Sequence, residues 1–146
     1  MREGLAGRLG ATRSRPCGLA GLAAALAGRG EYTAALAAAG EGLESEERTG
    51  QRRWGAELHR LAGIALWGLN RLEEAQNAFE EALRVARRQQ AKSYELRTAT
   101  SLAGLRRDQG RRTEARDLLA PIYGWFSEGF NTTDLKEAKA LLEELG

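Results

Sequence analysis

The sequence is poor in the residues that β-strands prefer. Its 146 residues include one Val (Val85) and two Ile (Ile64 and Ile122), against 26 Ala and 22 Leu. β-Branched and aromatic side chains favour strands, whereas Ala, Leu, Glu and Arg favour helices. This composition excludes a β-sandwich, a barrel or a parallel sheet as the main architecture, and it predicts an all-α fold.

The chain has one cysteine (Cys17) and one histidine (His59). A single cysteine excludes an intrachain disulfide, and a Cys/His metal site needs several ligands at short spacing. No Gly-Lys pair occurs, so the phosphate-binding loop Gly-x4-Gly-Lys-Ser/Thr is absent. No uninterrupted apolar run reaches membrane-spanning length. We therefore expect no catalytic residue, no metal, no cofactor and no membrane contact.

Lysine is scarce as well, since the basic residues are 19 Arg and 3 Lys, and the formal net charge is +2. Four arginines and a single acid lie within residues 1–16, so this segment carries +3 and residues 17–146 carry −1. Direct nucleic-acid binding needs a basic face on the fold itself, and we expect none. We interpret residues 1–16 as a disordered Arg/Gly-rich tail and residues 17–146 as one domain. The apolar stretch over residues 17–27 leaves a secretory signal open as the alternative.

Three segments of the chain are alike at intervals of 40 residues. They begin at Gly30, Asn70 and Gly110, and each continues with a charged residue and with an Ala five positions after the first residue. Gly and Asn tolerate the left-handed conformation that ends a helix, and a small Ala lets two helices approach closely. Flanking apolar residues recur at i, i+3, i+4 and i+7, which is one face of a helix. Each unit is therefore predicted to be a helix, a tight turn and a second helix.

The repeat predicts three helical hairpins and one last helix. The expected helices cover residues 17–28, 31–47, 52–69, 71–89, 92–109, 111–126 and 133–145. Thr132 or Thr133 can cap the last helix, because a hydroxyl oxygen accepts a hydrogen bond from an unpaired N–H of the first turn. Pro121 lacks an N–H and is expected to kink or shorten the sixth helix. Helix packing is predicted at Ala35, Gly63, Ala75, Phe79, Ala82, Ala103, Ala115 and Leu119.

The second unit carries the pattern His59-x2-Ala62-Gly63-x2-Leu66, followed by Ala75-x3-Phe79-x2-Ala82. This pattern resembles the tetratricopeptide repeat, in which a small residue lies where two helices touch and a large apolar one packs beside it. The period of 40 residues exceeds the usual ~34, so this is a long-period variant. The resemblance implies an α-solenoid of three tetratricopeptide-like hairpins plus a C-terminal capping helix.

A second resemblance covers residues 20–146. It rests on the stretches AELHRL (56–61), RDQGR (107–111), LAPIYGWFSEGF (119–130) and DLKEAKALL (134–142). These stretches are similar to the C-terminal repeat region of bacterial adenylate/guanylate cyclase–ATPase signalling proteins and of related ATPase-type transcriptional regulators. The chain contains no cyclase, ATPase or DNA-binding domain, so no catalysis is carried over to its residues.

The second resemblance implies a cytoplasmic, non-catalytic module for protein–protein or interdomain interaction. Its partner would be a protein, a peptide or another domain of a larger signalling protein. Two alternatives stay open. One is the repeat module of an ATPase-type DNA-binding regulator, and the weaker one is a small enzyme that uses His59.

In helical repeats of this kind, the first helices of the hairpins line the concave face. The predicted partner groove consists of Glu57, Arg60, Ile64, Trp67, Arg97, Thr100 and Arg107. An exposed Trp beside arginines suits a peptide or another domain, and an ordinary solvated face explains the same pattern equally well.

Four of the nine aromatic residues, Tyr123, Trp125, Phe126 and Phe130, fall within eight positions. We interpret them as a plug that packs the last helix onto the third hairpin, with an anchor for a partner as the alternative. His59 is expected to be semi-buried with one hydrogen bond. Cys17 is expected to be an inert small apolar residue.

Overall fold

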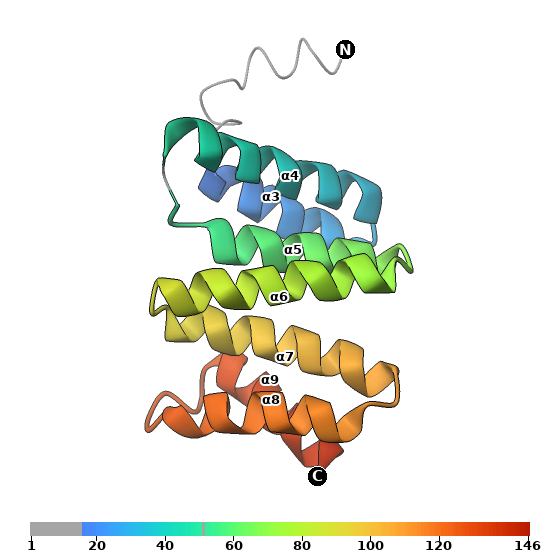
Figure 1. Cartoon of the computed structure of the whole chain (residues 1–146), viewed down its shortest axis with the longest axis vertical. Helices are drawn as coiled ribbons and strands as arrows, with labels where there is room; N and C mark the ends of the chain where they lie inside the picture. The colour runs from blue at the N-terminus through green and yellow to red at the C-terminus, as the bar shows by residue number, and fades with distance from the viewer. Residues whose placement is uncertain (1–15, 51) are drawn as a thin grey trace.

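The structure is a computed structural model that describes residues 16–50 and 52–146. Seven helices follow one another along the described chain, and they stack in sequence order from α3 and α4 at one end to α8 and α9 at the other (Figure 1). Their bounds are α3 (Pro16–Gly28), α4 (Tyr32–Thr49), α5 (Gly55–Gly68), α6 (Leu72–Arg88), α7 (Lys92–Asp108), α8 (Arg112–Trp125) and α9 (Thr133–Leu145). The predicted all-α fold of three hairpins and a last helix is confirmed. Residues 1–15 of the expected tail lie outside the described residues, while Pro16 belongs to α3.

The turn inside each hairpin has the left-handed residue that the repeat predicts. The φ angles are 78° at Gly30, 63° at Asn70 and 80° at Gly110. The N–H of the following residue donates to a carbonyl five positions back, at 2.8–2.9 Å, in the pairs Glu31–Leu26, Arg71–Leu66 and Arg111–Arg106. These bonds satisfy carbonyls that a helix end otherwise leaves unpaired. The three hairpins are therefore closed in the same way.

The connections between hairpins contain a second set of left-handed residues. The φ angles are 76° at Gly50 and 56° at Gln90, again 40 positions apart, and 79° at Gly129 before the last helix. Glycine adopts this conformation without a steric penalty, whereas Gln90 carries a Cβ that disfavours it. A left-handed turn residue thus occurs twice per period, and the repeat pattern predicts only the one inside each hairpin.

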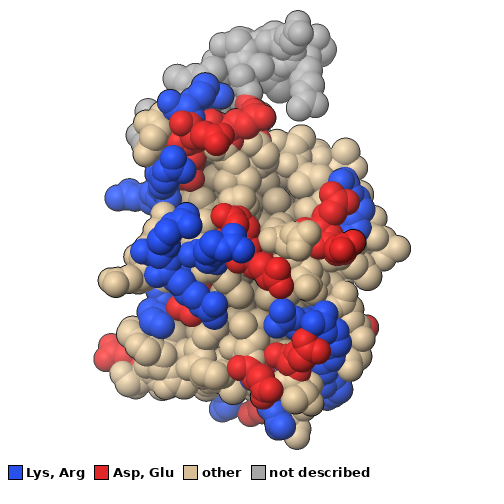
Figure 2. Space-filling model, viewed as in Figure 1, with Lys and Arg blue, Asp and Glu red and all other residues tan. Residues whose placement is uncertain are grey.

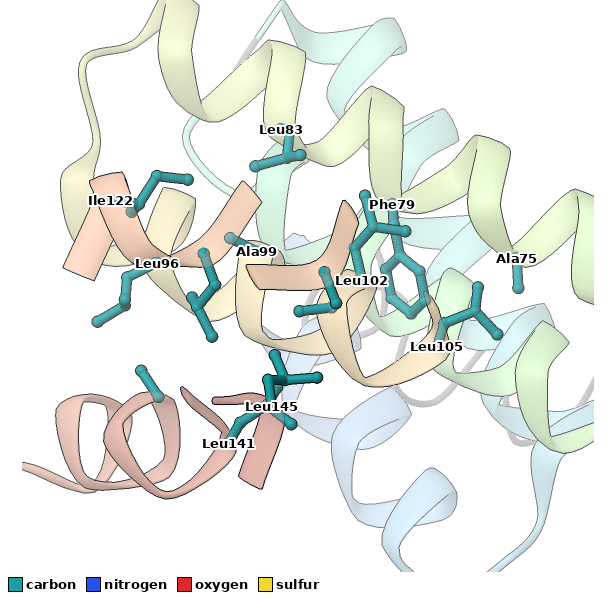
Figure 3. Packing of buried hydrophobic residues seen from close by; sticks show 14 of the residues in the cluster. Ala75, Phe79, Leu83, Leu96, Ala99, Leu102, Leu105, Ile122, Leu141 and Leu145 are labelled. Atoms are coloured by element: carbon teal, nitrogen blue, oxygen red, sulfur yellow. The ribbon is translucent and has the colours of Figure 1, made fainter. Parts of the chain in front are cut away.

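Small residues at the predicted contacts let the helices pack closely. Ala35, Ala75 and Ala115 have no exposed surface, and Phe79 and Leu119, each four residues after such an Ala, are equally buried. The other packing positions, Gly63, Ala82 and Ala103, are buried as well. The largest apolar cluster joins α5 through α9, with Leu141 and Leu145 of α9 beside Leu102 of α7 (Figure 3).

The last helix packs against both α7 and α8. Its buried residues are Leu135, Ala138, Leu141 and Leu145. Thr132 caps it, as predicted, because the hydroxyl oxygen accepts a hydrogen bond from the N–H of Leu135 at 3.4 Å. Helix α8 extends past Pro121 to Trp125, so the proline does not end the helix, and the expected kink stays a prediction.

Candidate interaction surface

The first helices of the hairpins form one face of the stack. Helix α5 packs against both α3 and α7, and α7 packs against α9, so the four odd-numbered helices lie in succession. All seven predicted groove residues lie on α5 or α7. Several of them contact residues of a neighbouring odd-numbered helix, so these side chains join the helices of this face.

A ladder of charged side chains crosses three of these helices; we call Arg60, Glu57, Arg97 and Asp134 the charge ladder. On α5, Arg60 Nη2 lies 2.7 Å from Glu57 Oε2, and Arg60 Nε donates to Glu57 Oε1 at 3.0 Å. Glu57 Oε2 also accepts from Arg97 Nη1 of α7 at 3.2 Å. Arg97 Nη2 then reaches Asp134 Oδ2 of α9 at 2.9 Å. The first three residues belong to the predicted partner groove, whereas Asp134 does not.

Burial and ion pairing have opposite effects on the pKa values of Glu57 and Arg97 in the charge ladder. Burial alone would raise the pKa of Glu57, yet the hydrogen bonds and charges of Arg60 and Arg97 outweigh it and leave the pKa below its ordinary value. Burial likewise opposes the charged form of Arg97, and Asp134 and Glu57 together raise its pKa above the ordinary value. Both groups are therefore held ionised by their partners.

The remaining groove residues are engaged within the fold. Arg107 pairs with Glu144 of α9, Nη1 to Oε1 at 3.1 Å, and the Thr100 hydroxyl donates to the Leu96 carbonyl at 2.8 Å. Ile64 is half-buried and packs against the core. Trp67 differs from the expected exposed side chain, since it is half-buried with its ring edge-on to Phe79 at a centroid distance of 6.4 Å. It fills the space that the missing side chain of Gly104 leaves on α7.

The aromatic plug forms only in part. Tyr123 and Phe126 are half-buried and pack against the core cluster. Trp125 and Phe130 remain 60% and 46% exposed, which corrects the expectation that all four rings pack inside. Each exposed ring contacts a half-buried one, Trp125 with Phe126 at 5.1 Å and Phe130 with Tyr123 at 5.8 Å between centroids.

His59 lies half-buried on α5, and burial followed by the charge of Arg84 lowers its pKa. It makes no hydrogen bond with another described residue, in contrast to the one bond expected. The side chain of Cys17 lies outside the described part of the structure. Among the described residues, no group of three or more His, Cys, Asp or Glu side chains is arranged to hold a metal ion.

Within the described ranges, no helix combines the length and the apolar character needed to cross a bilayer. Three stacked helical hairpins that end in a further helix, with Leu36 and Ile64 packing against both of the larger apolar clusters, define an α-solenoid. The sequence profile of the tetratricopeptide repeat family matches residues 14–88, more than half of the chain. The chain belongs to this family, whose repeats are generally non-catalytic and bind proteins or peptides. Neither the curated proteins nor the solved structures that were compared with the chain gave a match.

Proposed function

We propose that the chain is a non-catalytic module whose odd-helix face binds a protein partner or another domain of a larger protein. The observation that carries this proposal is the charge ladder. It aligns α5, α7 and α9 through paired, half-buried side chains, so that the face is ordered before a partner arrives. Preordered side chains lower the entropy that association costs.

The finer part of the proposal concerns the context. We infer a role as the cytoplasmic regulatory end of a bacterial cyclase–ATPase signalling protein, in which occupancy of the face influences a distant domain. The support is the similarity of the stretches over residues 56–61, 107–111, 119–130 and 134–142. An open reading frame upstream of Met1 that contains a phosphate-binding loop would support this context, and a frame without one would refute it.

The binding face can be tested with peptides selected from a random display library. We expect selected peptides to lose at least about tenfold in affinity for Thr100→Arg, which places a large charge on the face beside α5 and α9. The matched control is Thr113→Arg, because Thr113 is exposed on α8 and lies off the odd-helix face.

Equal binding to both variants would place the peptide site elsewhere and refute the assignment of the face. The non-catalytic part has a test of its own. Calorimetry with ATP at micromolar protein should give no binding heat, and detectable binding would contradict a purely interacting module.

A further inference from the structure

The even-numbered helices leave a hollow on the opposite side of α5 from the charge ladder. The second helices of the first two hairpins, α4 and α6, do not pack against each other in the described chain. Helix α5 packs against both of them, and its first residues lie between them. The space has a volume of about 500 Å³, and its walls include Leu43 of α4, Val85 of α6 and His59 of α5. We call it the α4–α6 hollow. It shares no lining residue with the predicted partner groove.

A buried carboxylate lines the hollow, and one of its two oxygens has no hydrogen-bond donor among the described residues. Glu46 is 4% exposed, and its Oε2 accepts a hydrogen bond from the backbone N–H of Trp54 at 2.6 Å. Its Oε1 accepts no hydrogen bond from any described residue. Burial raises the pKa of Glu46, against the opposing effects of the Trp54 N–H and the Arg52 charge. A cationic donor that reached Oε1 would form a charge-assisted hydrogen bond with it.

Among the residues that line the hollow, acidic side chains outnumber arginines, and this excess favours a cationic donor. Four carboxylates line it, those of Glu44, Glu46, Glu47 and Glu81, against the guanidinium groups of Arg52 and Arg88. Glu81 is paired with Arg84, whereas Glu44 and Glu47 make no ion pair with another described residue. Figure 2 shows basic side chains gathered over the end of α6 on this side, with acidic side chains next to them. The carboxylates outnumber the arginines, and a metal ion finds no suitable set of ligands here.

We propose that the α4–α6 hollow receives the arginine side chain of a partner protein, whose guanidinium group donates to Glu46 Oε1. The aliphatic part of the arginine packs against Leu43 and Val85 at the walls. A guanidinium group suits this place better than an ammonium group, because it is less strongly hydrated and its planar N–H groups reach several carboxylates at once. The inference rests on the proposed role as an interaction module, and it adds a second docking point outside the odd-helix face.

The test is an NMR titration of the full chain with N-acetylarginine amide and, as the uncharged isostere, N-acetylcitrulline amide. His59 is the sole histidine, so its imidazole protons report on the hollow without ambiguity. We expect the arginine probe to shift the His59 resonances and the Trp54 backbone amide with one saturable curve. The citrulline probe should leave them in place. Equal shifts from both probes, or none from the arginine probe, would overturn the proposal.

Three Glu→Gln variants test which carboxylates contribute to binding of the arginine probe. Glu46→Gln keeps an oxygen for the Trp54 N–H but loses the charge, and it should weaken binding of the arginine probe about tenfold. Glu47→Gln at the exposed rim should weaken it about threefold, and this variant keeps the proposal testable if the buried substitution impairs folding. Glu137→Gln, exposed on α9, is the matched control and should bind as the wild type does.

Wild-type affinity in Glu47→Gln and in a folded Glu46→Gln would refute the role of these carboxylates. The outcome is distinguishable from a failure of the proposed function. A chain that binds selected peptides through the odd-helix face but ignores the arginine probe overturns only the inference about the hollow.

Discussion

The contact between Gly63 of α5 and Phe79 of α6 offers the sharpest test of how the hairpins pack. A Cβ added at Gly63 would lie 2.6 Å and 2.7 Å from two carbons of the Phe79 ring, far closer than non-bonded carbons approach. Phe79 has no exposed surface, and its ring is held by the edge-on contact with Trp67. It therefore cannot move aside without displacing other core residues. We expect the overpacking in Gly63→Ala to cost about 1–3 kcal/mol.

The measurement needs a control, because alanine is itself a better helix former than glycine by up to about 1 kcal/mol. Gly40 lies inside α4, and a Cβ there would meet nothing within 4 Å. Gly40→Ala therefore gains the same helix propensity without the clash. The difference between the two variants in urea unfolding, followed by far-UV circular dichroism, isolates the contact with Phe79. Equal free energies of unfolding for the two variants would refute the predicted close approach of α5 and α6.

Ala75→Leu places a larger side chain where no surface is exposed, and it should lower the free energy of unfolding by about 1–3 kcal/mol. An unchanged melting curve would show that the packing of the second hairpin is misassigned. Gln90→Gly removes a Cβ from a residue with a φ of 56° and should stabilise the chain by about 1 kcal/mol in urea unfolding. A lower free energy of unfolding in Gln90→Gly would contradict the inference that the backbone at residue 90 is strained. Because its partners lower the pKa of Glu57 in the folded state, the stabilisation is present above the ordinary carboxyl pKa and is lost as the pH falls through the lowered one. The free energies of unfolding of wild type and Arg97→Gln should thus differ most at neutral pH and converge as the pH falls below the ordinary carboxyl range, and a constant difference would exclude Glu57 as the cause.

The sequence predicts the hairpins well because their determinants are local. A Gly or Asn at residues 30, 70 and 110 supplies the left-handed φ, and an Ala five positions later supplies the close contact. Both depend only on residue type and spacing. The positive φ of Gln90 is not predictable in this way, because glutamine is not a residue type that signals a positive φ.

Exposure was harder to predict than helix bounds, because it depends on neighbouring elements. Trp67 lies on α5 where the spacing favours an exposed position, but the absence of a side chain at Gly104 of α7 lets the ring sit inside. Trp125 and Phe126 are adjacent and equally apolar, yet one ring is exposed and the other packs against the core. Only the direction in which α8 ends decides between them.

The position of the last helix relative to the 40-residue period explains why the repeat does not predict Asp134 as a member of the charge ladder. Glu57 and Arg97 are 40 residues apart, as the repeat requires, whereas Arg97 and Asp134 are 37 apart. Arg107 and Glu144, at the other end of the same two helices, are also 37 apart. A uniform difference of three residues is nearly one helical turn of 3.6 residues. Helix α9 therefore occupies the place of a fourth first helix, but its ion-pair partners on α7 lie three residues off the 40-residue period, so a period read from the first three units cannot reveal them.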